Sequence, residues 1–330
     1  MTTIIRLLLV ASVHSATSAH AGPPTAAPVV SSPPEARWPD RTRHQVIEIG
    51  GHRMFYREAG PAHGPAVLLL HGYPSSSHTY RHLIPLLSGH VRVIAPDNLG
   101  SGYSDHPTDR PMTFDRLGEQ MIAFVDALGL DDVVIYMQDF GAPVGFRLAM
   151  ARSDRVRGLV VQNGNAYLDG LTPKRQAFFR DAAKARTDEE LKALRHWVSD
   201  EAIRTTQYLR DVPGERAVYM SPDTWTHDIA TMPAAAHREI QVDLFRDYQS
   251  NIDAYPRWQA WMRAHPVPAL VLWGERDPAF IADGARAYLR DLPHAELHLL
   301  DAGHFAAEER PVEVAQHLLS WLAREVVPSP

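Results

Sequence analysis

Short runs of apolar residues recur along most of the chain and are separated by segments of helical character. The most continuous runs are Val67–Leu70, Val91–Ala95, Val133–Tyr136, Leu159–Val161 and Leu270–Trp273, in which Arg92 is the one charged residue. Strands of a parallel sheet are buried on both faces, so they read as nearly continuous apolar runs. The pattern therefore predicts five such strands, and Ala295–Leu300 predicts one more.

Two further strands are predicted before this series, because Val46–Ile49 and Met54–Arg57 flank Gly50-Gly51 as in a β-hairpin. Helical segments follow the later strands at Phe114–Leu128, Pro143–Ala151, Asp283–Leu292 and Pro311–Glu325. Strands and helices that alternate in this way predict an α/β fold, with a mostly parallel eight-stranded sheet and helices on both faces.

The alternation stops between residues 165 and 265, where no clear apolar strand occurs. Helix-like stretches replace the strands at Pro173–Ala185, Asp188–Asp200 and Ile240–Asn251, and tyrosine and tryptophan are frequent. We predict that residues 165–265 form a helical cap inserted after the sixth strand. The core would then comprise residues 44–164 and 266–327.

The first residues have the pattern of a secretory signal peptide. One side-chain positive charge in Met1–Arg6 precedes a short apolar run, Leu7–Val13, and Ala19-His20-Ala21 supplies small residues for cleavage. We predict a signal peptide of residues 1–21, an unstructured Pro/Ala/Ser-rich lead-in of residues 22–43, and export to the periplasm or medium. Because a spanning helix needs ~20 apolar residues, no stable membrane anchor is expected in the mature chain.

Composition narrows the chemistry. The 330 residues are 45% hydrophobic and 22% charged, with a formal net charge of -6 and no cysteine. Disulfides, thiolate catalysis and cysteine-ligated metals are therefore excluded. The basic residues form no stripe with aromatics, so nucleic acid is not an expected partner.

Asp139 lies at the most informative turn of the sequence. The stretch VVIYMQDFGAPVG, from Val133, runs from a strand through a tight turn into a helix. This is the pattern of a nucleophile elbow with aspartate in place of serine. The alternative is that Asp139 caps the helix, since aspartate is a preferred N-cap residue. The turn alone does not distinguish the two.

Three more polar groups follow predicted strands. A glycine–proline loop, His71–Pro74, follows Val67–Leu70, Asp277 follows the seventh strand, and His304 follows the eighth. Ligands of open parallel sheets bind at the carboxyl ends of strands. The chain order of nucleophile, acid and histidine is also that of α/β-hydrolases. The coincidence favours a catalytic role for Asp139.

Over residues 46–322 the chain resembles the α/β-hydrolases with an aspartate nucleophile, the group of epoxide hydrolases and haloalkane dehalogenases. The motifs that carry the resemblance are HGYPSSSHTYR from His71, APDNLGSGYSD from Ala95, QDFGAPVG from Gln138, WGERDP from Trp273 and DAGHF from Asp301. They are specific for the fold and the nucleophile, and much less specific for the substrate.

The resemblance implies a two-step hydrolysis without cofactor or metal. Asp139, already ionised at neutral pH, would attack a saturated carbon and form an ester. His304, oriented by Asp277, would then activate water. The backbone N–H groups of Tyr73 and Phe140 would hold the oxyanion. The expected partners are a small apolar organic substrate and water.

The leaving group separates the two activities. Haloalkane dehalogenases usually carry tryptophan directly after the nucleophile, where this chain has Phe140, and many carry asparagine at the position of Tyr73. Trp225 or Trp258 in the cap could supply the missing indole. We predict that Tyr73, Phe140, Trp225 and Tyr167 contact the substrate.

A tyrosine in the cap favours epoxides. The segment DYQSN, from Asp247, resembles the cap segment that carries a ring-opening tyrosine, which makes Tyr248 the candidate acid. Tyr167, Tyr208 and Tyr219 are candidates for a second acid. Gln138 departs from the histidine common in epoxide hydrolases and occurs in some dehalogenases. We expect an epoxide hydrolase, with haloalkane dehalogenase as the alternative.

Other classes stay open. A serine esterase would need serine at the elbow, whereas Ser75, Ser76 and Ser77 lie in a different loop. A non-catalytic binding protein of this fold would tolerate loss of Asp139, Asp277 or His304, and all three are present. A cofactor-free lyase or oxygenase would not need a different sheet.

Overall fold

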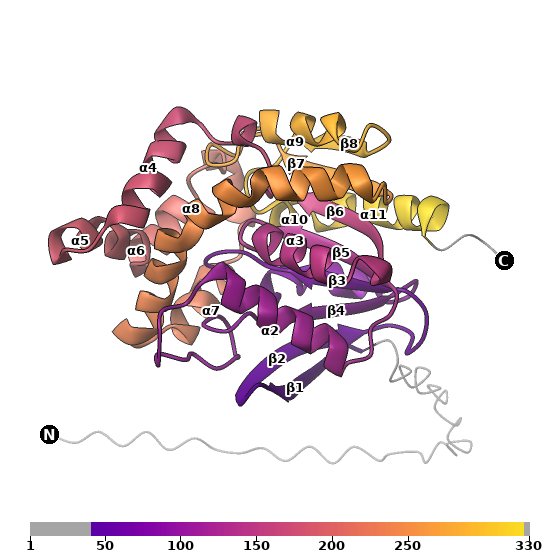
Figure 1. Ribbon diagram of the computed structural model, residues 1–330, viewed down its shortest axis with the longest axis horizontal. Helices are drawn as coiled ribbons and strands as arrows, with labels where there is room; N and C mark the ends of the chain where they lie inside the picture. The colour runs from indigo at the N-terminus through magenta and orange to yellow at the C-terminus, as the bar shows by residue number, and fades with distance from the viewer. Residues whose placement is uncertain (1–40, 327–330) are drawn as a thin grey trace, which may run out of the picture. The chain divides into compact units, whose positions relative to one another are not determined.

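One eight-stranded sheet forms the centre of the computed structural model, which describes residues 41–326 (Figure 1). Its strands are β1 (Arg43–Ile49), β2 (His52–Ala59), β3 (Ala66–Leu70), β4 (Arg92–Pro96), β5 (Val133–Gln138), β6 (Val156–Gln162), β7 (Ala269–Gly274) and β8 (Glu296–Leu300). Their order is β1-β2-β4-β3-β5-β6-β7-β8. β2 pairs antiparallel with β1 and β4, and the other neighbours are parallel. The predicted α/β fold is confirmed.

The predictions for the first residues lie outside this range. The predicted signal peptide, residues 1–21, is not among the described residues, and neither is most of the predicted lead-in, residues 22–43. β1 begins at Arg43, at the end of that lead-in.

The central strands are apolar because both of their faces are covered. Every residue of β3 and β5 is buried. Since side chains alternate along a strand, Leu68 and Ile135 contribute to the apolar cluster on one face of the sheet, and Leu69 and Val134 contribute to the cluster on the other. Burial on both faces explains why these strands could be predicted from uninterrupted apolar runs.

Helices cover both faces, as predicted. The first cluster includes side chains of α2 (Phe114–Ala127), α3 (Gly141–Ala151) and α9 (Asp283–Ala287). The second includes side chains of α1 (Leu83–Leu87), α10 (Ala306–Glu309) and α11 (Pro311–Glu325). The first cluster continues into the segment between β6 and β7, so that segment and the core share one apolar interior.

The segment between β6 and β7 is helical, and all of it is described. It contains α4 (Pro173–Lys184), α5 (Asp188–Trp197), α6 (Asp200–Ala202), α7 (Asp223–Thr231) and α8 (Ala235–Ala264), and no strand. A π-helical turn, Ile203–Tyr208, and a 3₁₀ turn, Gly214–Tyr219, connect α6 to α7. We keep the name cap for residues 165–265. α4 packs along α8, and α8 in turn contacts α2 and α3 of the core.

Two helices differ from their predicted lengths. α8 spans 30 residues and continues through Pro256, although proline removes a backbone hydrogen bond from a helix. The buried side chains of Tyr255, Trp258 and Trp261 flank that proline and hold the helix in place by packing. The predicted helix at Asp283–Leu292 is instead α9 followed by a 3₁₀ turn, Tyr288–Arg290. Within residues 41–326, no helix combines the length and apolar character needed to cross a membrane.

Candidate active site

Asp139 occupies a sharp turn between β5 and α3. Its backbone is left-handed, with φ of 49°, a conformation that costs a non-glycine residue on the order of 1–3 kcal/mol. Two glycines make room for the turn. A Cβ on Gly72 would lie 2.3 Å from Cβ of Asp139, and a Cβ on Gly141 would lie 2.2 Å from the carbonyl oxygen of Leu70. The predicted strand–turn–helix elbow is therefore present.

The carboxylate of Asp139 is oriented by backbone groups of the active site. Its Oδ2 accepts a hydrogen bond of 2.8 Å from the backbone N–H of Tyr73. The N–H of Phe140 also donates to the carboxylate. α3 begins without a side-chain cap, so its N-terminus does not explain the aspartate. These are the two N–H groups that were predicted to hold an oxyanion.

His304 and Asp277 complete the group. Nε2 of His304 lies 3.6 Å from Oδ1 of Asp139, and Nδ1 lies 2.6 Å from Oδ2 of Asp277. Asp277 also accepts hydrogen bonds from the backbone N–H groups of Ala279, at 2.8 Å, and Phe280, at 3.1 Å. The structure thus brings together the predicted nucleophile, base and orienting acid at the carboxyl ends of β5, β7 and β8.

Two residues that sequence reasoning missed support this arrangement. Nδ2 of Asn163 donates to Oδ2 of Asp277 at 3.0 Å, and its backbone carbonyl accepts from the N–H of Asp139 at 3.2 Å. A carboxylate oxygen of Asp211, in the cap, accepts from the backbone N–H of His304 at 2.9 Å. Asn163 directly follows β6, so its position at a strand end could have identified it from the sequence. Asp211 lies in no sequence motif that could have identified it.

The electrostatics separate the roles of the two carboxylates. Burial raises the pKa of Asp139, and His304 with the two N–H donors opposes that rise. Burial works against charge on Asp277 as well, but the adjacent His304 ring outweighs it and holds the pKa of Asp277 at about 2. Burial disfavours a charged His304, yet the Asp277 carboxylate raises the pKa of His304 above its ordinary value. Asp277 therefore stays ionised and orients His304.

A small pocket opens in front of Asp139, with a cavity volume of about 30 Å³. That volume is close to the space of one water molecule and far below that of ligand pockets, roughly 300–1,000 Å³, so a substrate enters only when the lining side chains move apart. The core lines it with Tyr73, Asp139, Phe140, Phe280 and His304, among others. The cap contributes Arg175, Phe179, Gln207, Arg210 and Phe245. The polar cap residues were not predicted, because nothing in their local sequence distinguishes them from exposed helix positions.

Tyr248, the candidate cap acid, does not line this pocket. It is fully buried in the layer behind it, with its ring centroid 5.6 Å from that of Phe140 and 3.9 Å from that of Phe179. Tyr255, two turns further along α8, lies beside it, and among the described residues neither hydroxyl has a hydrogen-bond partner outside this pair. Burial and the neighbouring Tyr255 raise the pKa of Tyr248 well above its ordinary value.

The structure does not bring the other predicted cap residues to the nucleophile. The hydroxyl of Tyr167 donates to Asp291 at 2.7 Å, and Tyr167 lines a separate surface depression. Trp225 packs near Tyr208, and Trp258 stacks on Phe146 of α3. The remaining tyrosine candidates do not line the pocket either. The hydroxyl of Tyr208 donates to the buried Asp228, and Tyr219 is 83% exposed. Of the four predicted substrate contacts, Tyr73 and Phe140 line the pocket.

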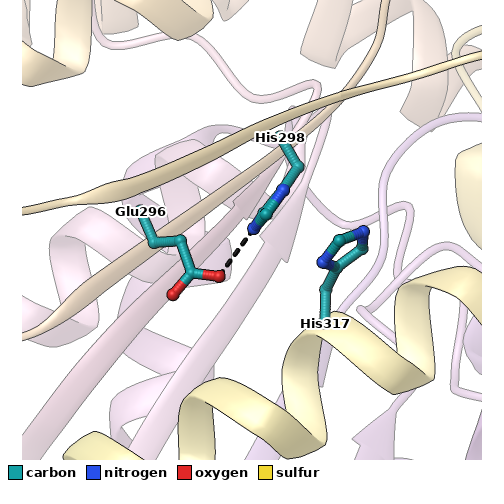
Figure 2. A group of neighbouring side chains, drawn as sticks. All are labelled: Glu296, His298 and His317. Atoms are coloured by element: carbon teal, nitrogen blue, oxygen red, sulfur yellow. Dashed lines mark hydrogen bonds and ion pairs between the residues drawn. The ribbon is translucent and has the colours of Figure 1, made fainter.

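A group that could hold a metal lies elsewhere. Nε2 of His298 is 2.6 Å from the Glu296 carboxylate on β8, and the ring of His317 on α11 lies 3.8 Å from that of His298, centroid to centroid (Figure 2). Arg324 already pairs with the other oxygen of Glu296. Glu296 begins β8 whereas His304 follows its end, so an ion held here would not contact the nucleophile.

Comparisons with known proteins support the fold and the hydrolase family. Residues 65–311 match the family model described as alpha/beta hydrolase fold. An uncharacterized hydrolase of Saccharomyces cerevisiae is 38% identical over 282 residues, which are 85% of this chain and 97% of the relative. A haloalkane dehalogenase of Mycobacterium marinum is 32% identical over 280 residues, covering 82% and 88%. The crystal structure of haloalkane dehalogenase DbeA from Bradyrhizobium elkani superposes with a TM-score of 0.73 at 23% identity, covering 88% of this chain and 100% of that one.

Proposed function

This chain belongs to the α/β-hydrolase fold family and is a hydrolase, and we propose that it acts at saturated carbon through an ester formed on Asp139. One observation carries the proposal. The Asp139 carboxylate is held between two backbone N–H groups on one side and His304 on the other. A serine hydrolase would place a hydroxyl there, which a base must deprotonate before attack, whereas a carboxylate attacks as it stands.

The first step forms the ester. Oδ1 of Asp139 bonds to the substrate carbon as the bond to the leaving group breaks, and the leaving group departs with its electron pair. Oδ2 becomes the carbonyl oxygen and keeps its hydrogen bond from Tyr73. The N–H donors therefore need no rearrangement between the carboxylate and the ester.

The second step cleaves the ester. His304 takes a proton from water through Nε2, and the hydroxide bonds to Cγ of Asp139, so that negative charge develops on Oδ2. The N–H groups of Tyr73 and Phe140 stabilise that charge. The intermediate collapses with loss of the alkoxide, which takes the proton from His304 to become the alcohol, and the Asp139 carboxyl releases the remaining proton of the water. One carboxylate oxygen of Asp139 now comes from water.

An epoxide is the substrate that we propose first. Ring opening leaves an alkoxide that needs a proton, and Tyr248 is a phenol without an outside hydrogen-bond partner whose ring packs against the pocket residues Phe140 and Phe179. Since Phe179 stacks on its ring, rotation of Phe179 would open Tyr248 to the substrate. No tryptophan, the usual halide donor, lines the pocket in the part of the chain that the structure describes.

Haloalkane hydrolysis is the second candidate, and a specific observation favours it. Curated relatives that match at 30–32% identity include haloalkane dehalogenases. The cap also places N–H donors of Arg175, Gln207 and Arg210 at the pocket, and such donors can stabilise a departing halide. The attack by Asp139 is the same in both reactions.

Isotope labelling tests the shared step. In single-turnover reactions in ¹⁸O-labelled water, with styrene oxide or 1-bromobutane, mass spectrometry should find the label in the peptide that contains Asp139. Replacing His304 by Gln should trap the ester on that peptide. Turnover that leaves the peptide unlabelled would contradict the proposal.

A tyrosine substitution separates the two substrate classes. We expect Tyr248→Phe to slow hydrolysis of styrene oxide about 10²-fold or more, the usual contribution of a general acid, and to leave 1-bromobutane hydrolysis nearly unchanged. Tyr219→Phe is the matched control, since Tyr219 is 83% exposed. Equal rates on styrene oxide for wild type and Tyr248→Phe would remove Tyr248 as the acid and favour the halide.

A further inference from the structure

Arg175 is a cation at the nucleophile's pocket that makes no direct ion pair among the described residues. It stands in the first turn of α4 and lines the pocket with Asp139. Within residues 41–326 its guanidinium makes no hydrogen bond and no ion pair. It lies instead over three aromatic rings, at 5.5 Å from the centroid of Phe178, 5.9 Å from Phe179 and 5.4 Å from Trp197. The aromatic faces fix its position and leave its N–H donors available.

Arg210 adds a second cation beside it. Arg210 follows the π-helical turn Ile203–Tyr208, and π-helical turns are frequent at functional sites. Its terminal nitrogen is 3.5 Å from Oδ1 of Asp277, at the limit of a hydrogen bond. Its buried Nε lies 3.9 Å from Oδ2 of Asp211, at ion-pair distance, and makes no hydrogen bond among the described residues. Asp277 is already satisfied by His304, Asn163 and two backbone N–H groups, so Arg210 retains donor capacity.

Placing two guanidinium groups together in a confined site is costly. Burial and the neighbouring Arg210 lower the pKa of Arg175, although Asp277 and Asp139 oppose this. Once the first step converts Asp139 into a neutral ester, Arg175 loses one of these two compensating charges. An anionic group on the substrate would supply the missing charge and the missing acceptors at the same time.

From this arrangement we propose that the pocket binds a substrate bearing a carboxylate, held by Arg175 and Arg210 while Asp139 attacks a nearby saturated carbon of the same molecule. The inference rests on the proposed function, because it names the substrate class of that site. Without the two cations, a carboxylate substrate would be repelled by the ionised nucleophile.

The size of the pocket favours short acids. The cavity volume is about 30 Å³, close to the space of one water molecule, so a carboxylate with a few carbon atoms needs the smallest displacement of the lining side chains. A 2-halocarboxylate would yield a 2-hydroxycarboxylate, a halide and a proton, with water supplying the new oxygen. A 2,3-epoxycarboxylate would yield a 2,3-dihydroxycarboxylate. Both classes combine a reactive saturated carbon with an anion that the cap can hold.

Paired substrates test the proposal. 2-Bromopropanoate and 2-bromopropanamide differ in charge and little in shape, as do glycidate and glycidamide. We expect wild type to hydrolyse at least one acid with higher kcat/KM than its amide. Arg175→Gln should lower kcat/KM for that acid about 10- to 100-fold, the contribution of a charged hydrogen bond, chiefly through KM, and should lower kcat/KM for the amide by a much smaller factor. Lys174→Gln, at the exposed neighbouring position, is the control and should change neither.

A binding measurement makes the test independent of turnover. Calorimetric titration of wild type with propanoate should show binding that Arg175→Gln loses and Lys174→Gln keeps, and propanamide should not bind. Thermal unfolding of both variants verifies that they fold. If propanoate does not bind and the amides react as well as the acids, the carboxylate proposal is overturned, while ¹⁸O in the Asp139 peptide would still support the ester. Equal loss of kcat on acid and amide in Arg175→Gln would assign the cation to the leaving group and also overturn it.

Discussion

The two sides of the pocket are held by different kinds of contact. On the core side, Asp139 is fixed by the backbone N–H of Tyr73 and by short contacts between turns at the ends of strands, and His304 is fixed by its hydrogen bond with Asp277. On the cap side, Arg175 rests on aromatic faces, and Arg210 makes two long contacts, 3.5 Å to Asp277 and 3.9 Å to Asp211. The core therefore fixes the reaction, and the cap leaves donors free for whatever substrate enters.

The largest expected effect comes from the core. Asp139→Asn keeps the shape of the side chain and its contact with the N–H of Tyr73, but the amide is not a nucleophile. We expect kcat/KM on the best substrate to fall on the order of 10⁴-fold or more, as for the loss of a central catalytic group. Initial rates on wild type and variant measure the effect.

The control for this variant is its fold. Circular dichroism and thermal unfolding should show an intact and slightly more stable protein, because a buried carboxylate with a raised pKa has been replaced by a neutral group. A folded Asp139→Asn variant with wild-type rates would show that the core side does not perform the chemistry.

The backbone of the core should matter almost as much as its side chains. A Cβ on Gly72 would lie 2.3 Å from Cβ of Asp139, so Gly72→Ala must displace the nucleophile or the loop that carries Tyr73. We expect kcat to fall about 10²-fold, since a shift of about 1 Å at a reacting group costs that much. Gly89→Ala, whose added Cβ would meet nothing within 4 Å, is the glycine control. Unchanged kcat in a folded Gly72→Ala variant would refute this tight positioning.

The fall of kcat at low pH should also test the core side of the pocket. Ester hydrolysis needs neutral His304, and the Asp277 carboxylate raises the pKa of His304 above its ordinary value of 6.5 despite burial. Because protonation removes the base, kcat should fall about tenfold for each pH unit below that pKa, with the midpoint of the fall above pH 6.5. Asp277→Asn should move the midpoint to lower pH. A midpoint well below pH 6 in the wild type would contradict the role of His304 as base.

The same contrast explains what the sequence could predict. Strands buried on both faces leave apolar runs, and β3, β5, β6 and β7 were found from them. The sheet determines the position of residues that follow such strands, such as Asp139 and His304. Their grouping therefore followed from the order of elements along the chain.

The cap could not be predicted in the same way. Its helices were expected, but which face of α4 carries Arg175 toward the nucleophile depends on how α4 packs on α8. Tyr167 and Trp225 were expected at the substrate because they are aromatic residues of the cap, and packing turned them elsewhere. The unexpected length of α8 has the same origin, since side chains packed around Pro256 sustain that helix. Such contacts leave no periodic pattern in the sequence.

The smallest expected effect tests which residues of the cap belong to the substrate site. Tyr167 donates a hydrogen bond of 2.7 Å to Asp291 and lies under the guanidinium of Arg290, 4.9 Å from its ring centroid. Tyr167→Phe keeps the ring and removes the hydroxyl, while Arg263 still pairs with Asp291 at 2.7 Å. We expect the free energy of unfolding to fall by about 1 kcal/mol, the net value of one hydrogen bond, with kcat and KM within twofold of wild type. Chemical denaturation and steady-state kinetics measure the two quantities. A large change in KM with little change in stability would show that the substrate site extends to Tyr167. A residue that only anchors the cap to the loop after α9 would instead change stability more than binding.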